Sequence, residues 1–269
     1  MSHHGEIDFS RYTRIKASRQ GRVLTLALSN PALMNAVDGE MHKELAQIFL
    51  DAADDKGSDV VVLTGEGAAF SAGGDLNWMK RSFEAGEAGP DAAEAKRIIF
   101  SLLDMEKPLI AKVRGAAVGL GATIALMCDV IFASDNARFA DPHVRAGIVA
   151  GDGGAIIWPQ LVGYARAKEY LMTGDPVKAV EAERIGLINH VVPDGELDAR
   201  VEAFAARLAG GALQAIKYTK VSANIGLKLL AHSILDTSIA YEMGTFHTDD
   251  HREAVNAFLE KRAPQFTGR

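Results

Sequence analysis

The chain has 269 residues, a formal net charge of −6 and 48% hydrophobic residues, values that exclude a disordered, collagen-like or coiled-coil protein. The net acidity argues against nucleic acid and membrane surfaces as main partners. A single cysteine, Cys128, excludes an intramolecular disulfide and every cysteine-based metal site, and we expect no metal. No apolar stretch reaches the roughly 20 residues of a membrane helix and no signal peptide is visible, so we expect a cytoplasmic protein.

The first half of the chain alternates short strands with helices. Residues 14–16 and 23–28 predict two strands joined by a turn at Gly21, and residues 38–54 predict an amphipathic helix with Asp38 as its N-cap. The same half holds three further strands, at 59–64, 108–113 and 130–133, and two further helices, over 92–103 and up to Cys128. This strand–helix–strand order predicts an α/β fold with parallel strands and right-handed crossovers.

After residue 150 the pattern is helical almost to the end of the chain. The predicted helices are 154–161, 165–172, 179–185, 196–209, 212–225, 229–243 and 249–261. The chain therefore divides into a flexible N-terminal tail over 1–12, an α/β core over 13–195 and a helical C-terminal region over 196–269.

Two glycine-rich loops follow predicted strands, at 65–74 and 115–121. The carboxyl ends of parallel strands are where α/β proteins bind ligands, and glycine lets the main chain approach a ligand closely. The second loop runs into a helix, whose N-terminus attracts negative charge. Neither loop carries a nucleotide-binding fingerprint. Ile124 stands where a dinucleotide-binding G-x-G-x-x-G that starts at Gly119 would need its third small residue, and no phosphate-binding G-x-x-x-x-G-K-[ST] run occurs.

Four motifs in order resemble a known family. They are MNAVDGEM (34–41), AFSAGGDL (69–76), RGAAVGLGATIALMCD (114–129) and AVNAFLEKRAPQF (254–266). Together they resemble the crotonase (enoyl-CoA hydratase/isomerase) superfamily from about residue 13 to 266. The resemblance implies a crotonase-like ββα spiral core and a helical C-terminal trimerisation region. It also implies an acyl-CoA or enoyl-CoA substrate, no cofactor apart from the coenzyme A of that substrate, and a homotrimer or dimer of trimers.

The resemblance also assigns site residues by motif position. Members of the family stabilise an enolate with two backbone N–H donors, which fall here on Gly74 and Leu120, the second replacing the usual glycine. Contacts with coenzyme A and substrate fall on Met34, Ala36, Val37, Ala72, Gly73, Asp75, Leu76, Gly119, Phe258 and Lys261. Trp78, Met79 and Phe83 either line the acyl pocket or belong to the core.

The two glutamates of the family's hydratases are missing. Their positions hold Thr123, which cannot replace a carboxylate as a base, and His143, which can act in acid–base catalysis. Asp152, within Gly151-Asp152-Gly153-Gly154, is either an N-cap of the following helix or a second acid–base group beside His143. Asp141 fits a turn residue before Pro142.

Three functions stay open from the sequence. The first is a CoA-thioester enzyme of the enoyl-CoA hydratase/isomerase type with unusual acid–base residues. The second is a retro-Claisen C–C hydrolase using His143 and Asp152, since crotonase-superfamily hydrolases that cleave β-diketones have a similar Pro-His and Gly-Asp-Gly pair. The third is a non-catalytic acyl-CoA-binding protein. Thr123 favours this function, because it replaces a catalytic glutamate of the family.

Overall fold

The protein is described by a computed structural model that covers residues 7–86 and 90–269. Its main sheet has six strands in the order β1-β2-β3-β4-β6-β9, and a second sheet has three in the order β5-β7-β8. The six are β1 (Ile15–Gln20), β2 (Val23–Leu28), β3 (Val60–Gly65), β4 (Leu109–Val113), β6 (Val130–Ser134) and β9 (His190–Val192). The three are β5 (Ala116–Val118), β7 (Arg138–Ala140) and β8 (Val177–Lys178). Every pairing of the main sheet is parallel except that of β1 with β2, as the strand–helix alternation predicts.

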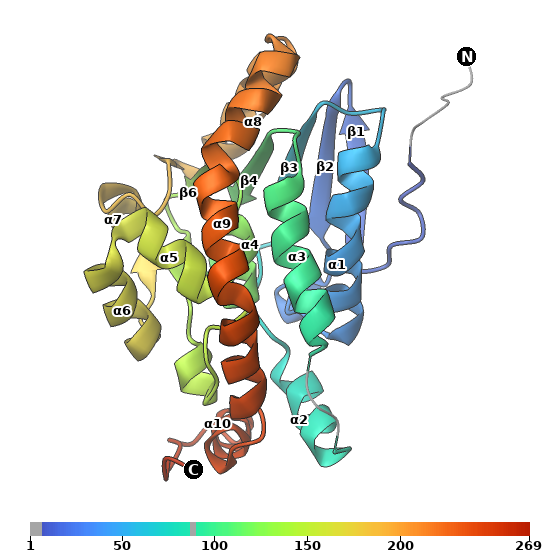
Figure 1. Cartoon of the computed structure of the whole chain (residues 1–269). Helices are drawn as coiled ribbons and strands as arrows, with labels where there is room; N and C mark the ends of the chain where they lie inside the picture. Colours follow the sequence, from blue (N-terminus) through green and yellow to red (C-terminus); the bar gives the residue numbers. More distant parts are fainter. Residues whose placement is uncertain (1–6, 87–89) are drawn as a thin grey trace.

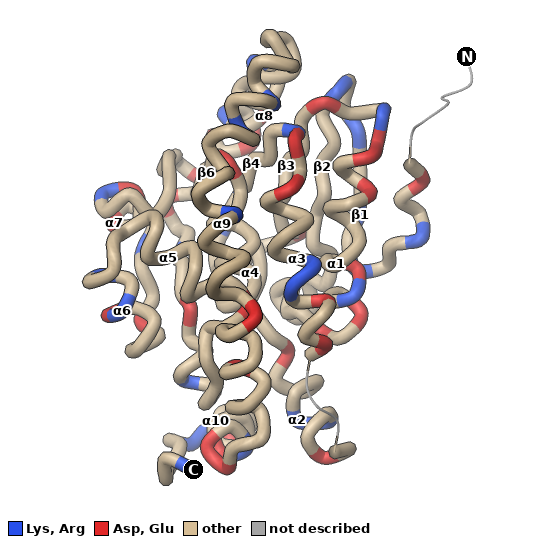
Figure 2. Tube along the Cα trace, in the orientation of Figure 1, with Lys and Arg blue, Asp and Glu red and all other residues tan. Residues whose placement is uncertain are grey.

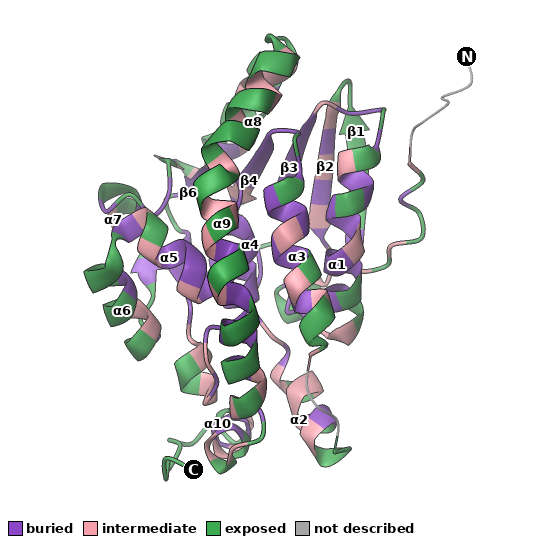
Figure 3. Ribbon diagram, viewed as in Figure 1, coloured by how far each residue is buried: buried purple, intermediate pink, exposed green. Residues whose placement is uncertain are grey.

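Helices cover both faces of the main sheet (Figure 1). On one face lie α1 (Gly39–Asp54), α3 (Ala92–Asp104) and α9 (Leu213–Thr245), and on the other lies α8 (Leu197–Ala209). Residues 60–63 of strand β3 are all apolar because both faces of the strand are buried. Val61 and Leu63 join the larger core, whereas Val60 and Val62 pack with Val201 of α8. Figure 3 shows these central strands buried and the outer surfaces of the helices exposed.

The smaller helices are α2 (Leu76–Glu84), α4 (Leu120–Leu126), α5 (Gly154–Val162), α6 (Tyr164–Thr173), α7 (Ala179–Arg184) and α10 (Asp249–Leu259). Of these, α2 and α10 lie at one end of the molecule and α5, α6 and α7 lie along one side (Figure 1). Asp38 caps α1 by accepting a hydrogen bond from the N–H of Met41, which confirms its predicted role. Cys128 is buried beside the carbonyl of Ile124, and burial raises the pKa of its thiol, as suits an inert core residue.

Two sequence predictions about the C-terminal half are wrong. Helix α9 is a single helix of 33 residues, not two helices over 212–225 and 229–243. Its apolar face continues past the expected break and packs against α3, with Ala231, Leu235 and Ile239 buried. The second error concerns β8 and β9, which interrupt the half that was predicted to be helical, because strands of two and three residues are too short to show a period of two.

Neither acidic nor basic residues dominate one side of the molecule. Acidic and basic residues are interspersed along the trace in Figure 2. Although α9 is long, neither it nor any other helix among the described residues is apolar enough over a sufficient length to span a membrane.

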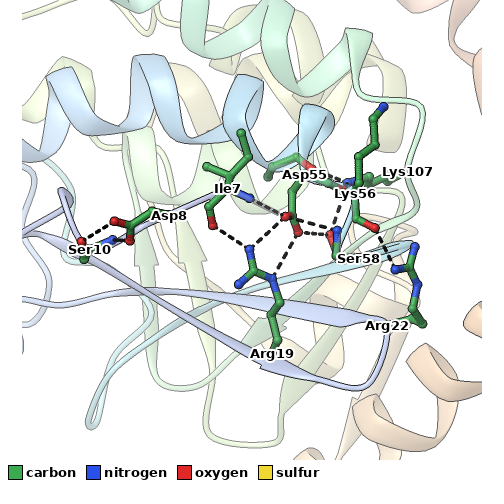
Figure 4. A network of polar contacts seen from close by, with 11 residues as sticks. Ile7, Asp8, Ser10, Arg19, Arg22, Asp55, Lys56, Ser58 and Lys107 are labelled. Atoms are coloured by element: carbon green, nitrogen blue, oxygen red, sulfur yellow. Dashed lines mark hydrogen bonds and ion pairs between the residues drawn. The ribbon is translucent and has the colours of Figure 1, made fainter. Parts of the chain in front are cut away.

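Ile7, the first described residue, is tied to the core through Asp55 (Figure 4). The buried carboxylate of Asp55 accepts hydrogen bonds from the Ile7 N–H at 3.0 Å, the Arg19 guanidinium at 2.9 Å and the Ser58 hydroxyl at 2.8 Å. Burial alone would raise the pKa of Asp55, but these donors lower it to about 2. Of the tail predicted over 1–12, residues 1–6 lie outside the described part of the chain.

Candidate functional site

The two glycine loops predicted from the sequence meet in the structure. The N–H of Ser71 donates to the carbonyl of Ala116 at 2.9 Å, and the N–H of Val118 donates to the carbonyl of Ser71 at 3.0 Å. The loops are so close that a Cβ on Gly73 would lie 2.9 Å from the carbonyl oxygen of Val118. Gly73 also has a φ of +84°, a conformation that favours glycine. Glycine at this position therefore brings the two loops together.

This contact places the N–H groups of Gly74 and Leu120 beside one cavity. Val37 pairs with the residues on either side of Gly74, which leaves the N–H of Gly74 on the opposite side of the chain. Leu120 is the first residue of α4, so its N–H has no partner within that helix. Both residues line a cavity of about 40 Å³.

His143 lies in the same cavity between two carboxylates. It starts a 3-10 helix that spans His143–Ala146. Its Nδ1 makes a short contact with Asp141, and its Nε2 lies 3.5 Å from Oδ2 of Asp152. The prediction that Asp141 is merely a turn residue is wrong, because its carboxylate is fully buried against the imidazole. Asp141 therefore fixes the orientation of the ring, and Asp152 faces the nitrogen on the other side.

The charges of this trio stabilise one another. Burial alone would lower the pKa of His143, but the carboxylates of Asp141 and Asp152 outweigh it and raise this pKa well above its ordinary value. Burial alone would raise the pKa of Asp152, but the positive charge and hydrogen bond of His143 lower it. The two shifts together favour an imidazolium ion at His143 paired with a carboxylate at Asp152.

Of the two alternatives that the sequence left open for Asp152, the N-cap is wrong, because Gly153 is the N-cap of α5 and no side chain caps this helix. The carboxylate of Asp152 instead faces the cavity beside His143, and the nearby N–H of Gly154 helps to lower its pKa. The hydroxyl of Thr123 lies 3.5 Å from its Oδ1, at the long end of hydrogen-bond distance. Thr123 is itself fully buried and is not among the residues that line the cavity, so it contacts Asp152 from behind.

The glycines around Asp152 each make room for a different neighbour. A Cβ on Gly151 would lie 2.6 Å from Cβ of Glu242, and one on Gly153 would lie 2.9 Å from Cγ2 of Thr123. A Cβ on Gly154 would lie only 2.0 Å from Oδ2 of Asp141. This segment is therefore rich in glycine because residues of the site occupy the space that side chains would need.

Two titratable residues of the cavity escaped the sequence analysis. His42 of α1 lines the cavity, and its Nδ1 lies 2.8 Å from Oε2 of Glu94 on α3. Glu242 of α9 also lines the cavity and is buried. The available signal was a polar residue inside an apolar helical stripe, since His42 follows Met41 and precedes the buried face of α1.

The remaining cavity wall is apolar. Trp78 and Met79 of α2 line it together with Met243 and Phe246, whereas Phe83 lies farther along α2 in edge contact with the His251 ring. Met79 extends its terminal methyl group to 2.4 Å from the position of a Cβ on Gly74. Met79 therefore fills the space beside the Cα of Gly74.

The residues assigned to coenzyme A are spread over a wider area. Val37 lines the cavity with Gly74, Ala36 is buried, and Asp75 caps α2 by accepting from the N–H of Asn77. Met34 and Phe258 are exposed, and Lys261 follows the end of α10 with a φ of +57°. The assigned residues that do not line this cavity are Met34, Ala36, Ala72, Gly73, Asp75, Leu76, Gly119, Phe258 and Lys261.

Among the described residues, one group has donor atoms placed for a cation. His143, Asp152 and Glu242 offer ligand atoms that all lie within 4.8 Å of one another. The raised pKa of His143 opposes metal binding, because a ligating imidazole must first lose its proton.

An enzyme of the crotonase class is the kind of protein that this sheet and its paired glycine loops define. Comparison with known proteins gives the particular family. The enoyl-CoA hydratase/isomerase family profile matches residues 18–269. The chain is 33% identical to a probable enoyl-CoA hydratase of Mycobacterium tuberculosis, covering 96% of this chain and 99% of the relative. It is 34% identical to a crotonyl-CoA hydratase of Syntrophomonas wolfei, covering 95% and 98%.

A solved structure agrees with these relatives. An enoyl-CoA hydratase/isomerase from Mycobacterium paratuberculosis superposes with a TM-score of 0.88 at 34% identity, covering 92% of this chain and 99% of the other. The chain belongs to the enoyl-CoA hydratase/isomerase family. The crotonase-like fold and the family resemblance read from the four sequence motifs are thus confirmed.

Proposed function

We propose that the protein hydrates an enoyl-CoA thioester through an enolate held by the N–H groups of Gly74 and Leu120, with His143 and Asp152 in place of the usual glutamates. One observation carries this proposal: two donor loops and an ion pair of an imidazole and a carboxylate line the same small cavity. The names of its relatives, among them a crotonyl-CoA hydratase, support the choice of substrate class.

The proposed reaction begins with water adding to the β-carbon of the enoyl group. The proton of the water passes to the carboxylate of Asp152, because His143 is already protonated, and the two groups titrate together since Nε2 of His143 lies 3.5 Å from this carboxylate. The electrons of the double bond move to the thioester oxygen, which the two N–H groups stabilise. Protonation of the α-carbon then completes the addition of water.

The test is hydration of crotonyl-CoA by wild type, His143→Gln and Asp152→Asn. We expect each substitution to lower kcat by about 10²–10⁴-fold, the usual size of a lost acid–base group, with a small change in KM. Asp236→Asn serves as a control, because Asp236 lies on α9 in an exposed ion pair with Lys96. Acyl-CoA binding by the wild type without turnover would refute hydration and indicate the non-catalytic binding protein.

A second candidate is hydrolysis of a β-diketone, and the charged trio of Asp141, His143 and Asp152 favours it. Here water adds to one carbonyl, the carbon–carbon bond breaks, and the leaving enolate is held by the same N–H groups before it takes up a proton. Cyclohexane-1,3-dione is a suitable probe, since its cleavage by water yields a keto acid. Release of that acid at an unchanged rate by both His143→Gln and Asp152→Asn would contradict this mechanism.

Coenzyme A contacts and assembly belong to the same proposal. Val37 and Gly74 would hold the thioester end, while Lys261 with Phe258 of a neighbouring copy would contact the phosphate end. Large apolar side chains exposed along α9 support assembly as a trimer or dimer of trimers. Multi-angle light scattering gives the mass of the assembly, and a monomer at micromolar concentration would contradict it.

A further inference from the structure

Glu242 reaches the site from a distant part of the chain. It lies near the end of α9, and it enters because Gly151 has no side chain: a Cβ there would lie 2.6 Å from Cβ and 2.8 Å from Oε2 of Glu242. Glu242 is only 4% exposed, and among the described residues no donor or acceptor partners its Oε2. Burying a carboxyl group without a partner is costly, so its place beside the cavity requires an explanation.

The surroundings of Glu242 favour its neutral form. Burial raises the pKa of Glu242 well above its ordinary value, and the negative charges of Asp152 and Asp141 act in the same direction, opposed by the positive charge of His143. From the helices packed around the cavity, the other titratable groups are His42 of α1 and its partner Glu94 of α3. The surroundings of Glu242 therefore favour a carboxylic acid that keeps its proton to a higher pH than an ordinary glutamate.

Resting on the proposed function, we propose that Glu242 is the proton donor of this site and completes the reaction opposite the His143–Asp152 pair. The carboxylic acid gives its proton to the α-carbon of the enolate, the electrons return from the thioester oxygen to form the new C–H bond, and Glu242 becomes a carboxylate. The proton that the His143–Asp152 pair took from water then moves to Glu242, over groups that lie within 4.8 Å of one another. This transfer restores every group and balances the addition of one water molecule.

The same chemistry can be followed without hydration. Butyryl-CoA has no double bond to hydrate, but its α-proton exchanges with D₂O if the enzyme forms the enolate and protonates it again. For Glu242→Gln we expect exchange and kcat on crotonyl-CoA to fall by about 10²–10⁴-fold, with KM for crotonyl-CoA changed less than about threefold. Glutamine keeps the shape and, through its amide N–H in place of the carboxyl O–H, a hydrogen-bond donor, but it cannot release a proton, so a purely structural role predicts no such loss.

A second readout reports on the proton itself. The infrared C=O stretch of a protonated buried carboxyl group should be present in the wild type and absent in Glu242→Gln. Asp236→Asn on the same helix is the matched control, and it should retain the band, the exchange rate and kcat. Equal thermal stability of Glu242→Gln and wild type would show that the variant is folded.

The outcomes separate this inference from the proposed function. Wild-type exchange of butyryl-CoA without hydration of crotonyl-CoA refutes hydration and still tests Glu242. Exchange in Glu242→Gln within threefold of the wild type overturns the inference. If the wild type neither exchanges nor hydrates, both proposals are overturned, whatever the infrared spectrum shows.

Discussion

Gly151 and Glu242 share one space, because Cβ of Glu242 lies 2.6 Å from where Gly151 would place a Cβ of its own. A Cβ on Gly151 would also lie 2.4 Å from the backbone carbonyl oxygen of Ser238. No side-chain movement can relieve this clash, because the carbonyl belongs to the backbone. Helix α9 and the loop before α5 are therefore packed too closely for any larger residue at position 151.

Gly151→Ala should push α9 away from the site. We expect a loss of about 1–3 kcal/mol in the free energy of unfolding, the usual effect of overpacking, together with a fall in kcat. Urea denaturation and crotonyl-CoA kinetics measure the two effects. Gly226→Ala is the matched control, because a Cβ there meets nothing within 4 Å on the exposed side of the same helix. It should instead stabilise the protein by about 0.5–1 kcal/mol.

Met79→Ala should change the preferred length of the acyl chain. The cavity of about 40 Å³ is close to the share of liquid volume of one water molecule, about 30 Å³, and the methyl group of Met79 covers Gly74. Shortening this side chain opens space beside Gly74, one of the two proposed oxyanion donors. We expect the ratio of kcat/KM for hexenoyl-CoA to that for crotonyl-CoA to rise by about 10-fold, since one methylene is worth 10–200-fold in a pocket. An unchanged ratio would show that Met79 does not limit the pocket.

The pH dependence of activity should reflect the protons on His143 and Glu242. Both pKa values are raised, so both protons are present at neutral pH and are lost as the pH rises through the raised values. We expect kcat/KM to be level near neutrality and to fall on the alkaline side. In His143→Gln the contribution of the imidazolium to this alkaline limb should disappear. Activity that rises steadily with pH would indicate that a neutral histidine acts as the base.

Asp55 should contribute to stability in a defined range of pH. Its folded pKa, about 2, lies below that of an unfolded aspartate, so its contribution is complete above about pH 4 and is lost as the pH falls toward about pH 2. We expect Asp55→Asn to cost about 2 kcal/mol at pH 7 and to flatten the acid limb of the stability curve. Urea unfolding at several pH values measures both. Asp59→Asn is a control on a more exposed ion pair with Arg22.

Metal removal should leave the reaction unchanged. Although His143, Asp152 and Glu242 have suitably spaced donor atoms, the imidazole is protonated at neutral pH and its Nδ1 is held by Asp141. We therefore expect the same kcat on crotonyl-CoA before and after dialysis against a chelator. Loss of activity on dialysis and recovery with one divalent cation would show that the cluster binds a metal.

Local features of this fold were predictable from the sequence, whereas contacts made by distant segments were not. The cap at Asp38 could be read because the group it bonds, the N–H of Met41, is three residues away. The break expected inside α9 was wrong because packing against α3, which no local pattern records, keeps the helix continuous.

The residues of the site were likewise predictable where a local motif marks them and not where distant segments meet. The glycine content of the two loops predicted a ligand site, and His143 and Asp152 stood at motif positions. Asp141 appeared to be a turn residue, since only the folded chain places the imidazole against its carboxylate. Glu242 belongs to a long helix whose sequence gives no sign that one carboxyl group points into a cavity beside Gly151.

The packing of the Gly151–Gly154 segment has a consequence for how such chemistry is inherited. Each of its three glycines faces a different neighbour, namely Glu242, Thr123 and Asp141, so a side chain at any one of these positions would displace a residue of the site. A search of genomes for similar catalysts should therefore use the spaced signature of Asp141, His143, the Gly-Asp-Gly-Gly segment and the distant Glu242, rather than overall similarity to hydratases.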